Sequence, residues 1–288
     1  MRAYLPEFEV EAPGRLDAVL ARMQEGWLPL AGGTDVMVVL AAGQLKPGRY
    51  VSIWELDELR GIDVRDDFIV AGALTTYTDV REHPVMRAEY PMLVDAARLS
   101  GAIAIQNRGT LGGNIVNASP AADSPPALVA YDAELELVSA RGARWVPYRG
   151  FHTGYKTMQK RSDELVRAIR MPRRPGGDGA LHYYRKVGTR KAQAIAKIGL
   201  AALGRIHDGK VAHVRIALAS VAPTVLEARR TEAAVLGHAL DDRTIAAALA
   251  AFDTELTPID DVRSTERYRR TVAKNLVEDF LRTLLANR

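Results

Sequence analysis

Two pairs of adjacent glycines lie in surroundings that could bind an anion. The first pair, Gly32-Gly33, lies in "PLAGGTDVMVVL" at residues 29–40 and is followed by Thr34, Asp35 and an apolar run. Glycine can adopt positive φ and lets a ligand approach the bare backbone. Successive backbone N–H groups in such a turn form an anion-binding concavity. One pair alone is a weak indication, because an ordinary turn has the same composition.

The second pair, Gly112-Gly113, lies in "NRGTLGGNIVNASPAAD" at residues 107–123 and again adjoins a threonine. The same freedom allows these glycines to reach positive φ and to present N–H groups to a ligand. The carboxylate of Asp123 could accept a hydrogen bond from a hydroxyl or an imide N–H. Neutral polar side chains also follow the pair: Asn114, Asn117 and Ser119.

Together the two turns indicate a ligand with two anionic groups. A diphosphate fits two opposed anion-binding turns, and two unrelated structural turns are the alternative that the residues leave open. Neither segment is a Walker motif, because no Gly-Lys-Ser/Thr follows, and neither is a G-x-G-x-x-G fingerprint. The residues therefore predict a dinucleotide or diphosphate ligand that is not held in the Rossmann manner.

The elements around the first glycine pair predict a small α/β unit. Residues 14–25 place four large apolar side chains at helical spacing. A short strand to Leu30, the glycine turn, a short helix from Asp35 and a strand through 50–53 follow. Such a unit of about 55 residues is close to the lower size limit of an independent fold, so we expect it to pack on the segment that follows.

The rest of the chain predicts two further units. Residues 90–99 have a helical pattern, but the Pro-, Asn- and Gly-rich stretch after them cannot form a long helix. Prolines and glycines concentrate at 171–183, so we expect a domain boundary there. Before this boundary, strands are predicted at 68–75, 133–140, 143–148 and 165–172. After it, strands are predicted at 201–203 and 211–221 and helices at 231–240 and 242–256, and a last helix has Ala273, Leu276, Val277, Phe280, Leu281, Leu284 and Leu285 on one face.

Composition excludes several classes of protein. The chain has 288 residues, a net charge of +4 and no cysteine. The absence of cysteine excludes disulfides, thiolate zinc sites and iron–sulfur clusters held by cysteines of this chain. The charges are mixed along the chain, which argues against a nucleic-acid partner. The apolar runs are too short for a membrane span.

Two further expectations concern location and metals. Glu7, Glu9 and Glu11 stand where a signal peptide would have its apolar core, so we expect a cytoplasmic protein. The histidines show no ligand spacing, so no metal site is predicted.

With these residues in view, the chain resembles the FAD-binding medium subunits of the molybdenum hydroxylases, the xanthine dehydrogenase and carbon monoxide dehydrogenase type. The resemblance rests on "LAGGTD" and "NRGTLGGNIVNASPAAD", with "VSIWELDELRGIDV" and "FIVAGALTTYTDV" between them. It continues through "FHTGYKTMQKRSDELVRAIRMP", "ASVAPTVLEA" and "DVRSTERYRR". These segments occur in the family's order along essentially the whole chain, so the match is specific.

The resemblance implies an α+β fold. A two-part, non-Rossmann FAD-binding domain would comprise a small α/β unit at 1–56 and an α+β unit at 57–175. A C-terminal domain with a small antiparallel sheet and helices would occupy 176–288.

The resemblance also implies which residues bind FAD. The first turn would line one half of the diphosphate site through its backbone N–H groups, and the second turn would line the other half. Asp123 would form a hydrogen bond with the cofactor, Val116 and Val166 would lie beside the flavin ring, and Lys186 would lie near it. The full implied set is Ala31, Gly32, Gly33, Thr34, Asp35, Thr110, Leu111, Gly112, Gly113, Asn114, Val116, Asn117, Asp123, Val166 and Lys186. Ser100 stands where some relatives place an aromatic, so no aromatic stack on the flavin is predicted.

Alternative interpretations stay open for several of these features. Lys186 lies in a basic stretch with Arg185 and Arg190, which is typical of a solvated face. Tyr183 and Tyr184 are more typical of packing residues than of catalytic acids. The charges of "DVRSTERYRR" could cap and solvate the last helix.

By resemblance, FAD carries the chemistry and the chain works in a complex. A molybdopterin large subunit would oxidise the substrate, and a small subunit with 2Fe–2S clusters would relay electrons. FAD would pass them to NAD, O₂ or a quinone, in a dimer of heterotrimers. Two alternatives are a free-standing FAD-dependent oxidoreductase of vanillyl-alcohol oxidase type and a flavin-free binding module. The first usually has its own acid–base cluster, which residues 178–288 do not show.

Overall fold

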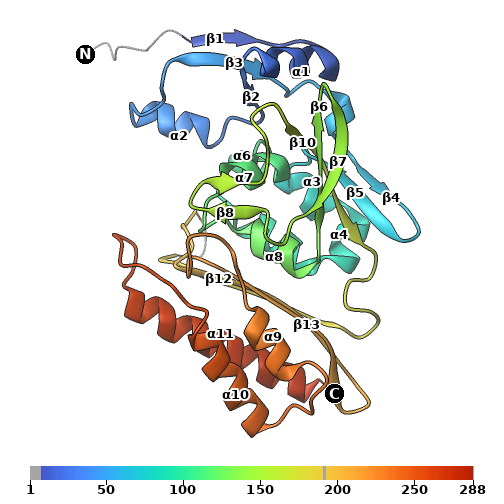
Figure 1. Cartoon of the computed structure of the whole chain (residues 1–288), viewed down its shortest axis with the longest axis vertical. Helices are drawn as coiled ribbons and strands as arrows, with labels where there is room; N and C mark the ends of the chain where they lie inside the picture. Colours follow the sequence, from blue (N-terminus) through green and yellow to red (C-terminus); the bar gives the residue numbers. More distant parts are fainter. Residues whose placement is uncertain (1–7, 191–192, 288) are drawn as a thin grey trace.

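Sheets with their own helices follow one another along the long axis of the molecule (Figure 1). The computed structural model describes residues 8–190 and 193–287. Glu7, part of the acidic pattern noted near the N-terminus, lies outside the described residues. No helix in the described part of the chain is long and apolar enough to cross a membrane.

The first unit is a parallel sheet in the order β1-β3-β2. Its strands are β1 (Phe8–Glu11), β2 (Leu28–Leu30) and β3 (Gly48–Ser52), with helices α1 (Leu16–Gln24) and α2 (Val36–Ala41) between them. The predicted helix, glycine turn and two strands are confirmed, and strand β1 was not predicted.

The core of the first unit is shared with the second. Val19 and Trp27 of the first unit belong to one buried cluster with Leu74, Val138 and Leu165. The expected packing of this small unit on the following segment is therefore confirmed.

The second unit is an antiparallel sheet in the order β4-β5-β10-β6-β7, with helices on one side (Figure 1). The strands are β4 (Ile62–Val64), β5 (Phe68–Gly72), β6 (Glu134–Ser139), β7 (Gly142–Pro147) and β10 (Leu165–Pro172). The helices are α3 (Tyr77–Glu82), α4 (Pro84–Glu89), α5 (Pro91–Leu99), α6 (Ile103–Gln106), α7 (Leu111–Asn117) and α8 (Ser124–Ala130), and a short hairpin pairs β8 (His152–Gly154) with β9 (Thr157–Met158). As predicted, the stretch after α5 forms short helices rather than one long one.

The third unit is an antiparallel sheet in the order β11-β12-β13-β14, which lies between the second unit and three helices (Figure 1). The strands are β11 (Leu181–Val187), β12 (Ile198–His207), β13 (Lys210–Ala219) and β14 (Leu226–Glu227), and the helices are α9 (Arg229–Val235), α10 (Asp242–Asp253) and α11 (Glu266–Ala286). Strand β11 was not predicted, because its pattern adjoins the Pro- and Gly-rich boundary.

Strand β12 shows why this sheet is apolar on both faces. Ala201 and Leu203 belong to the core of the second unit, whereas Leu200 and Ala202 belong to the core beneath α10 and α11. Successive strand residues face opposite sides, so a sheet covered on both faces needs a continuous apolar run. The predicted apolar face of the last helix is confirmed at its centre, where Phe280 and Leu281 are buried. The α+β class is confirmed.

Candidate functional site

The two glycine turns lie against each other. A Cβ built on Gly32 would lie 1.7 Å from the carbonyl oxygen of Arg108, so only glycine permits this approach. Asn117 Nδ2 donates a hydrogen bond of 3.1 Å to Asp35 Oδ1, which links the far ends of the two segments. Gly33 has a φ of 75°, a conformation that favours glycine. Segments about eighty residues apart in the sequence are thus brought together as the ligand argument requires.

The first turn presents a run of free backbone donors. Within residues 8–190 and 193–287, no oxygen accepts a hydrogen bond from the N–H groups of Gly32 to Val36. The N–H groups of a helix's first turn lack partners inside the helix, and the glycine turn before α2 extends this run. Asp35 does not cap α2 with its side chain. Consecutive free N–H groups on a partly exposed turn are suited to binding a phosphate.

The second turn is built differently, and the sequence argument about its glycines was wrong. Neither Gly112 nor Gly113 has positive φ; both lie in helix α7. Gly112 is needed for packing, because a Cβ there would lie 2.7 Å from the Cβ of Ala73. The N–H of Gly112 donates to Ala73 O at 2.9 Å, and the N–H of Gly113 donates to Thr110 Oγ1 at 3.1 Å. Leu111 also donates within the chain, so most donors of this turn are already used.

Asp123 and Lys186 form a buried ion pair. Lys186, on β11, places Nζ 2.7 Å from Asp123 Oδ2 and donates to Leu99 O at 2.9 Å. Its side chain is only 6% exposed, so the interpretation of Lys186 as part of a solvated face is wrong. Ser100 Oγ lies 3.2 Å from the same carboxylate oxygen. Tyr184 donates its hydroxyl hydrogen to the backbone oxygen of Asp123 at 3.2 Å.

The second carboxylate oxygen of Asp123 has no partner. Among the described residues, Oδ1 is buried and receives no hydrogen bond. Burial raises the pKa of Asp123, and the nearby charge of Lys186 only partly offsets that effect. A buried acceptor without a donor is costly, so this oxygen is suited to receiving an N–H from a ligand.

The remaining predicted residues lie on α7 and β10. Val116 is 37% exposed on α7, whereas Val166 is 2% exposed and belongs to the core of the second unit. Asn114 Oδ1 accepts a hydrogen bond of 2.6 Å from Ser124 Oγ. The geometry therefore leaves Val116 accessible and Val166 enclosed.

Comparisons with known proteins identify the family. Residues 6–174 match the family described as "FAD binding domain in molybdopterin dehydrogenase", and residues 182–284 match "CO dehydrogenase flavoprotein C-terminal domain". The chain belongs to the family that these two domains define, the flavoproteins of molybdopterin dehydrogenases. It is an FAD-binding oxidoreductase subunit of the molybdenum hydroxylases.

Relatives of this flavoprotein subunit match over most of their length. The carbon monoxide dehydrogenase medium chain of Hydrogenophaga pseudoflava is 32% identical over 96% of both chains. The xanthine dehydrogenase FAD-binding subunit of Escherichia coli O157:H7 is 33% identical over 87% of both chains. In a solved structure of the Hydrogenophaga pseudoflava carbon monoxide dehydrogenase, a chain 31% identical superposes with a TM-score of 0.93 over 99% of both chains.

The residues of the flavoprotein subunit fit FAD. The free N–H groups of Gly32 to Val36 match the need of a diphosphate for donors. The unpartnered Oδ1 of Asp123 matches the imide N–H that a flavin ring carries. Within the described residues, no group of three or more His, Asp or Glu side chains could hold a metal ion.

Sequence reasoning missed the residues that hold Asp123. From the sequence, Ser100 indicated only that no aromatic side chain stacks on the flavin, and Tyr184 was interpreted only as a packing residue. The pattern that could have identified Tyr184 is the alternation of side chains along β11. Tyr184 and Lys186 are two residues apart, so their side chains lie on the same face of the strand. Without a predicted strand at 181–187, that pattern could not be used.

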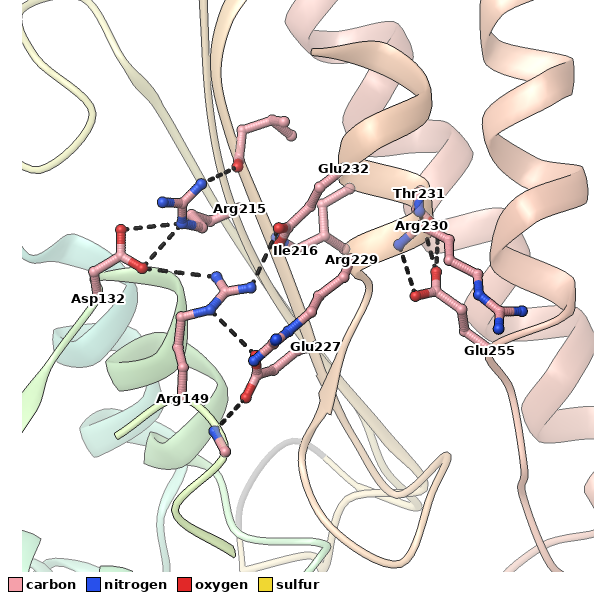
Figure 2. Close-up of polar contacts among 12 residues, drawn as sticks. Asp132, Arg149, Arg215, Ile216, Glu227, Arg229, Arg230, Thr231, Glu232 and Glu255 are labelled. Carbon is pink, nitrogen blue, oxygen red and sulfur yellow. Dashed lines mark hydrogen bonds and ion pairs between the residues drawn. The ribbon is translucent and has the colours of Figure 1, made fainter. Parts of the chain in front are cut away.

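A cluster of ion pairs connects the second and third units (Figure 2). Arg149, in the loop after β7, lies 3.2 Å from Glu227 Oε2 and 3.3 Å from Glu232 Oε2. Asp132 accepts from Arg215 Nε at 2.9 Å. Because these partners come from both units, the cluster fixes the third sheet, and thus Lys186, relative to the loop that carries Asp123.

Proposed function

We propose that this chain is the medium subunit of a molybdenum hydroxylase complex and passes electrons from a partner subunit through its FAD to an external acceptor. The unpartnered Oδ1 of Asp123, beside Lys186, is the observation that carries this proposal. When bound, FAD supplies two-electron redox chemistry that the side chains of this chain do not provide.

The chain's own residues bind and tune the cofactor. The N–H groups of the segment from Gly32 to Val36 hold the diphosphate, together with the polar side chains at the start of α7. Asp123 Oδ1 would accept the imide N–H of a bound flavin, and Lys186 would hold the Asp123 carboxylate in place through its 2.7 Å contact with Oδ2. Because the ammonium of Lys186 and the carboxylate of Asp123 carry opposite charges, the pair would act on the flavin mainly through the hydrogen bond at Oδ1, and replacing either residue should shift the reduction potential. Val116 provides an apolar contact on the accessible side.

The other redox centres belong to partner chains in this proposal. The chain has no cysteine, so 2Fe–2S clusters held by cysteine must lie on an iron–sulfur small subunit. A molybdopterin large subunit would then oxidise the substrate, and NAD, O₂ or a quinone would accept the electrons. Matched chains are named for complexes acting on carbon monoxide, xanthine and glyceraldehyde, which supports substrate choice by another subunit.

Three further points belong to the proposal. We propose domains at 1–56, 57–175 and 176–288, because each range contains one of the three larger sheets described above. We also propose a dimer of heterotrimers as the assembly and the cytoplasm as its location.

A comparison of the isolated chain with its complex tests the function. The isolated chain should bind FAD but leave it oxidised when organic substrates are added anaerobically. The complex with both partner subunits should bleach the flavin band when its substrate is added. Bleaching by the isolated chain alone would instead favour the free-standing oxidoreductase of vanillyl-alcohol oxidase type.

A further inference from the structure

Two C-terminal segments that the flavin site does not use are joined to it by one chain of hydrogen bonds. The segments at 219–228 and 261–270 meet where Arg269 Nη1 donates to Ser220 O at 2.8 Å. The N–H of Ser220 in turn donates to Pro120 O at 2.7 Å. Pro120 lies three residues before Asp123, so this chain of bonds runs from α11 to the flavin-binding loop.

Arg269 is a buried cation with an unusual set of partners. It is 4% exposed, and its Nη2 lies 2.7 Å from Asp261 Oδ1. Its other amino group reaches Ser220 O and, at 3.5 Å, Lys197 O. Burying a guanidinium is costly unless it is paired, and a charged donor to a carbonyl is stronger than a neutral one. Arg269 therefore fixes the backbone at Ser220 firmly.

Ser220 has a backbone conformation that needs this support. Its φ is 68°, in the left-handed region that is unfavourable for a residue other than glycine. Such conformations persist only where several surrounding contacts hold the backbone in place. At Ser220 three bonds do so: its oxygen accepts from Arg269, its N–H donates to Pro120, and its Oγ donates to Ala196 O at 3.0 Å.

The loop that receives this support has few other anchors of its own. Ala118, at its start, also has positive φ, 49°. Within the described part of the chain, the N–H groups of Ala121 and Ala122 donate only to Ser119 of the same loop. Pro120 O is thus the point at which the third unit holds the middle of this loop, whereas Tyr184 and Lys186 hold its end at Asp123.

We propose that Arg269 is a positioning residue for the flavin site, acting through Ser220 and Pro120 on the loop that carries Asp123. The inference rests on the proposed role of Asp123 in FAD binding. If these segments only stabilised the last helix, their substitution would not change FAD affinity. The proposed role predicts that it does.

Four substitutions in the full chain test this route. Arg269→Met removes the donor to Ser220, and Arg269→Lys keeps the cation if the first variant does not fold. Arg270→Met is the matched control on the same helix, because Arg270 pairs with Asp253 and Glu266 within the third unit. Ser220→Gly, added to Arg269→Met, places at position 220 a residue that adopts positive φ without strain, so the backbone there should no longer need the support of Arg269.

The readouts are FAD affinity, visible circular dichroism of the bound flavin, and hydrogen exchange of residues 118–123 without FAD. Arg269→Met should weaken FAD binding about fivefold or more, within the usual range of coupling between sites. It should also speed exchange in the loop, and Ser220→Gly should recover part of both effects. Arg270→Met should change neither, even where it lowers the melting temperature.

The opposite results are equally clear. Unchanged FAD affinity and dichroism in Arg269→Met, with weakened binding in Asp123→Asn, would overturn the positioning role alone. A loss that Ser220→Gly does not recover would overturn the route through Ser220. Unchanged binding in Asp123→Asn would overturn the proposed flavin site and this inference with it.

Discussion

Replacing Gly32 with alanine should separate the two glycine turns. The new Cβ would lie 1.7 Å from Arg108 O and 2.7 Å from Arg108 C, whereas ordinary contacts begin at 3.4 Å. The backbone atoms cannot rotate away, so the turns must move apart by about 1.7 Å, the difference between 3.4 and 1.7 Å. Overpacking of this kind costs about 3 kcal/mol at the upper end of its usual range. That corresponds to a fall in melting temperature of roughly 6–12 °C for a domain of this size.

Two other glycines separate this clash from general effects of the substitution. Gly14 has no positive φ, and no atom of the described residues lies within 4 Å of a Cβ built there, so Gly14→Ala should leave stability and FAD binding nearly unchanged. Gly33 has a nearest neighbour at 3.9 Å but a φ of 75°, so Gly33→Ala should cost only the left-handed strain of about 1–2 kcal/mol.

The assay is thermal unfolding with and without FAD, combined with a fluorescence titration of FAD. A displacement larger than 1 Å breaks hydrogen-bond geometry, so Gly32→Ala should lose FAD affinity by about tenfold or more. Gly32→Ala that melts with the wild type and binds FAD normally would refute the contact between the turns.

Three further predictions follow from particular contacts. Gly112→Ala should destabilise the chain by about 1–3 kcal/mol in chemical denaturation, because its Cβ would meet Ala73 at 2.7 Å; unaltered stability would contradict the close packing. FAD affinity should rise with pH through the raised pKa of Asp123, because an N–H donor to Oδ1 favours the carboxylate, and Asp123→Asn should abolish that dependence in titrations at several pH values. Arg149→Met should leave Glu232 without its ion pair to the second unit and Glu227 paired with the exposed Arg229, and it should lower the melting temperature by several degrees; an unchanged melting temperature would show that the pairs of Arg149 do not stabilise the contact between the units.

The first glycine turn shows what the sequence could predict. A Gly-Gly-Thr-Asp segment before an apolar run indicated a turn with free donors, and the structure has such donors from Gly32 to Val36. This property is local, because it depends on the backbone of adjacent residues. The apolar face of α11 is predictable for the same reason, since helical spacing is read within one segment.

The second turn and Lys186 show what the sequence could not predict. Whether Gly112 serves positive φ or close packing depends on Ala73, which lies far away in the sequence. Lys186 belongs to a basic stretch, yet it is buried because β11 places it opposite Asp123 and Leu99. Such contacts between distant segments have no pattern in one sequence.

The central claim is that this chain binds FAD in the site between its glycine turns and Asp123. The measurement that tests it most directly is the visible absorption spectrum of the full chain after incubation with FAD and desalting, alone and with its partner subunits. Our account predicts flavin bands that survive desalting at one FAD per chain and that weaken in Asp123→Asn and Gly32→Ala. A chain that stays colourless even in the assembled complex would contradict it.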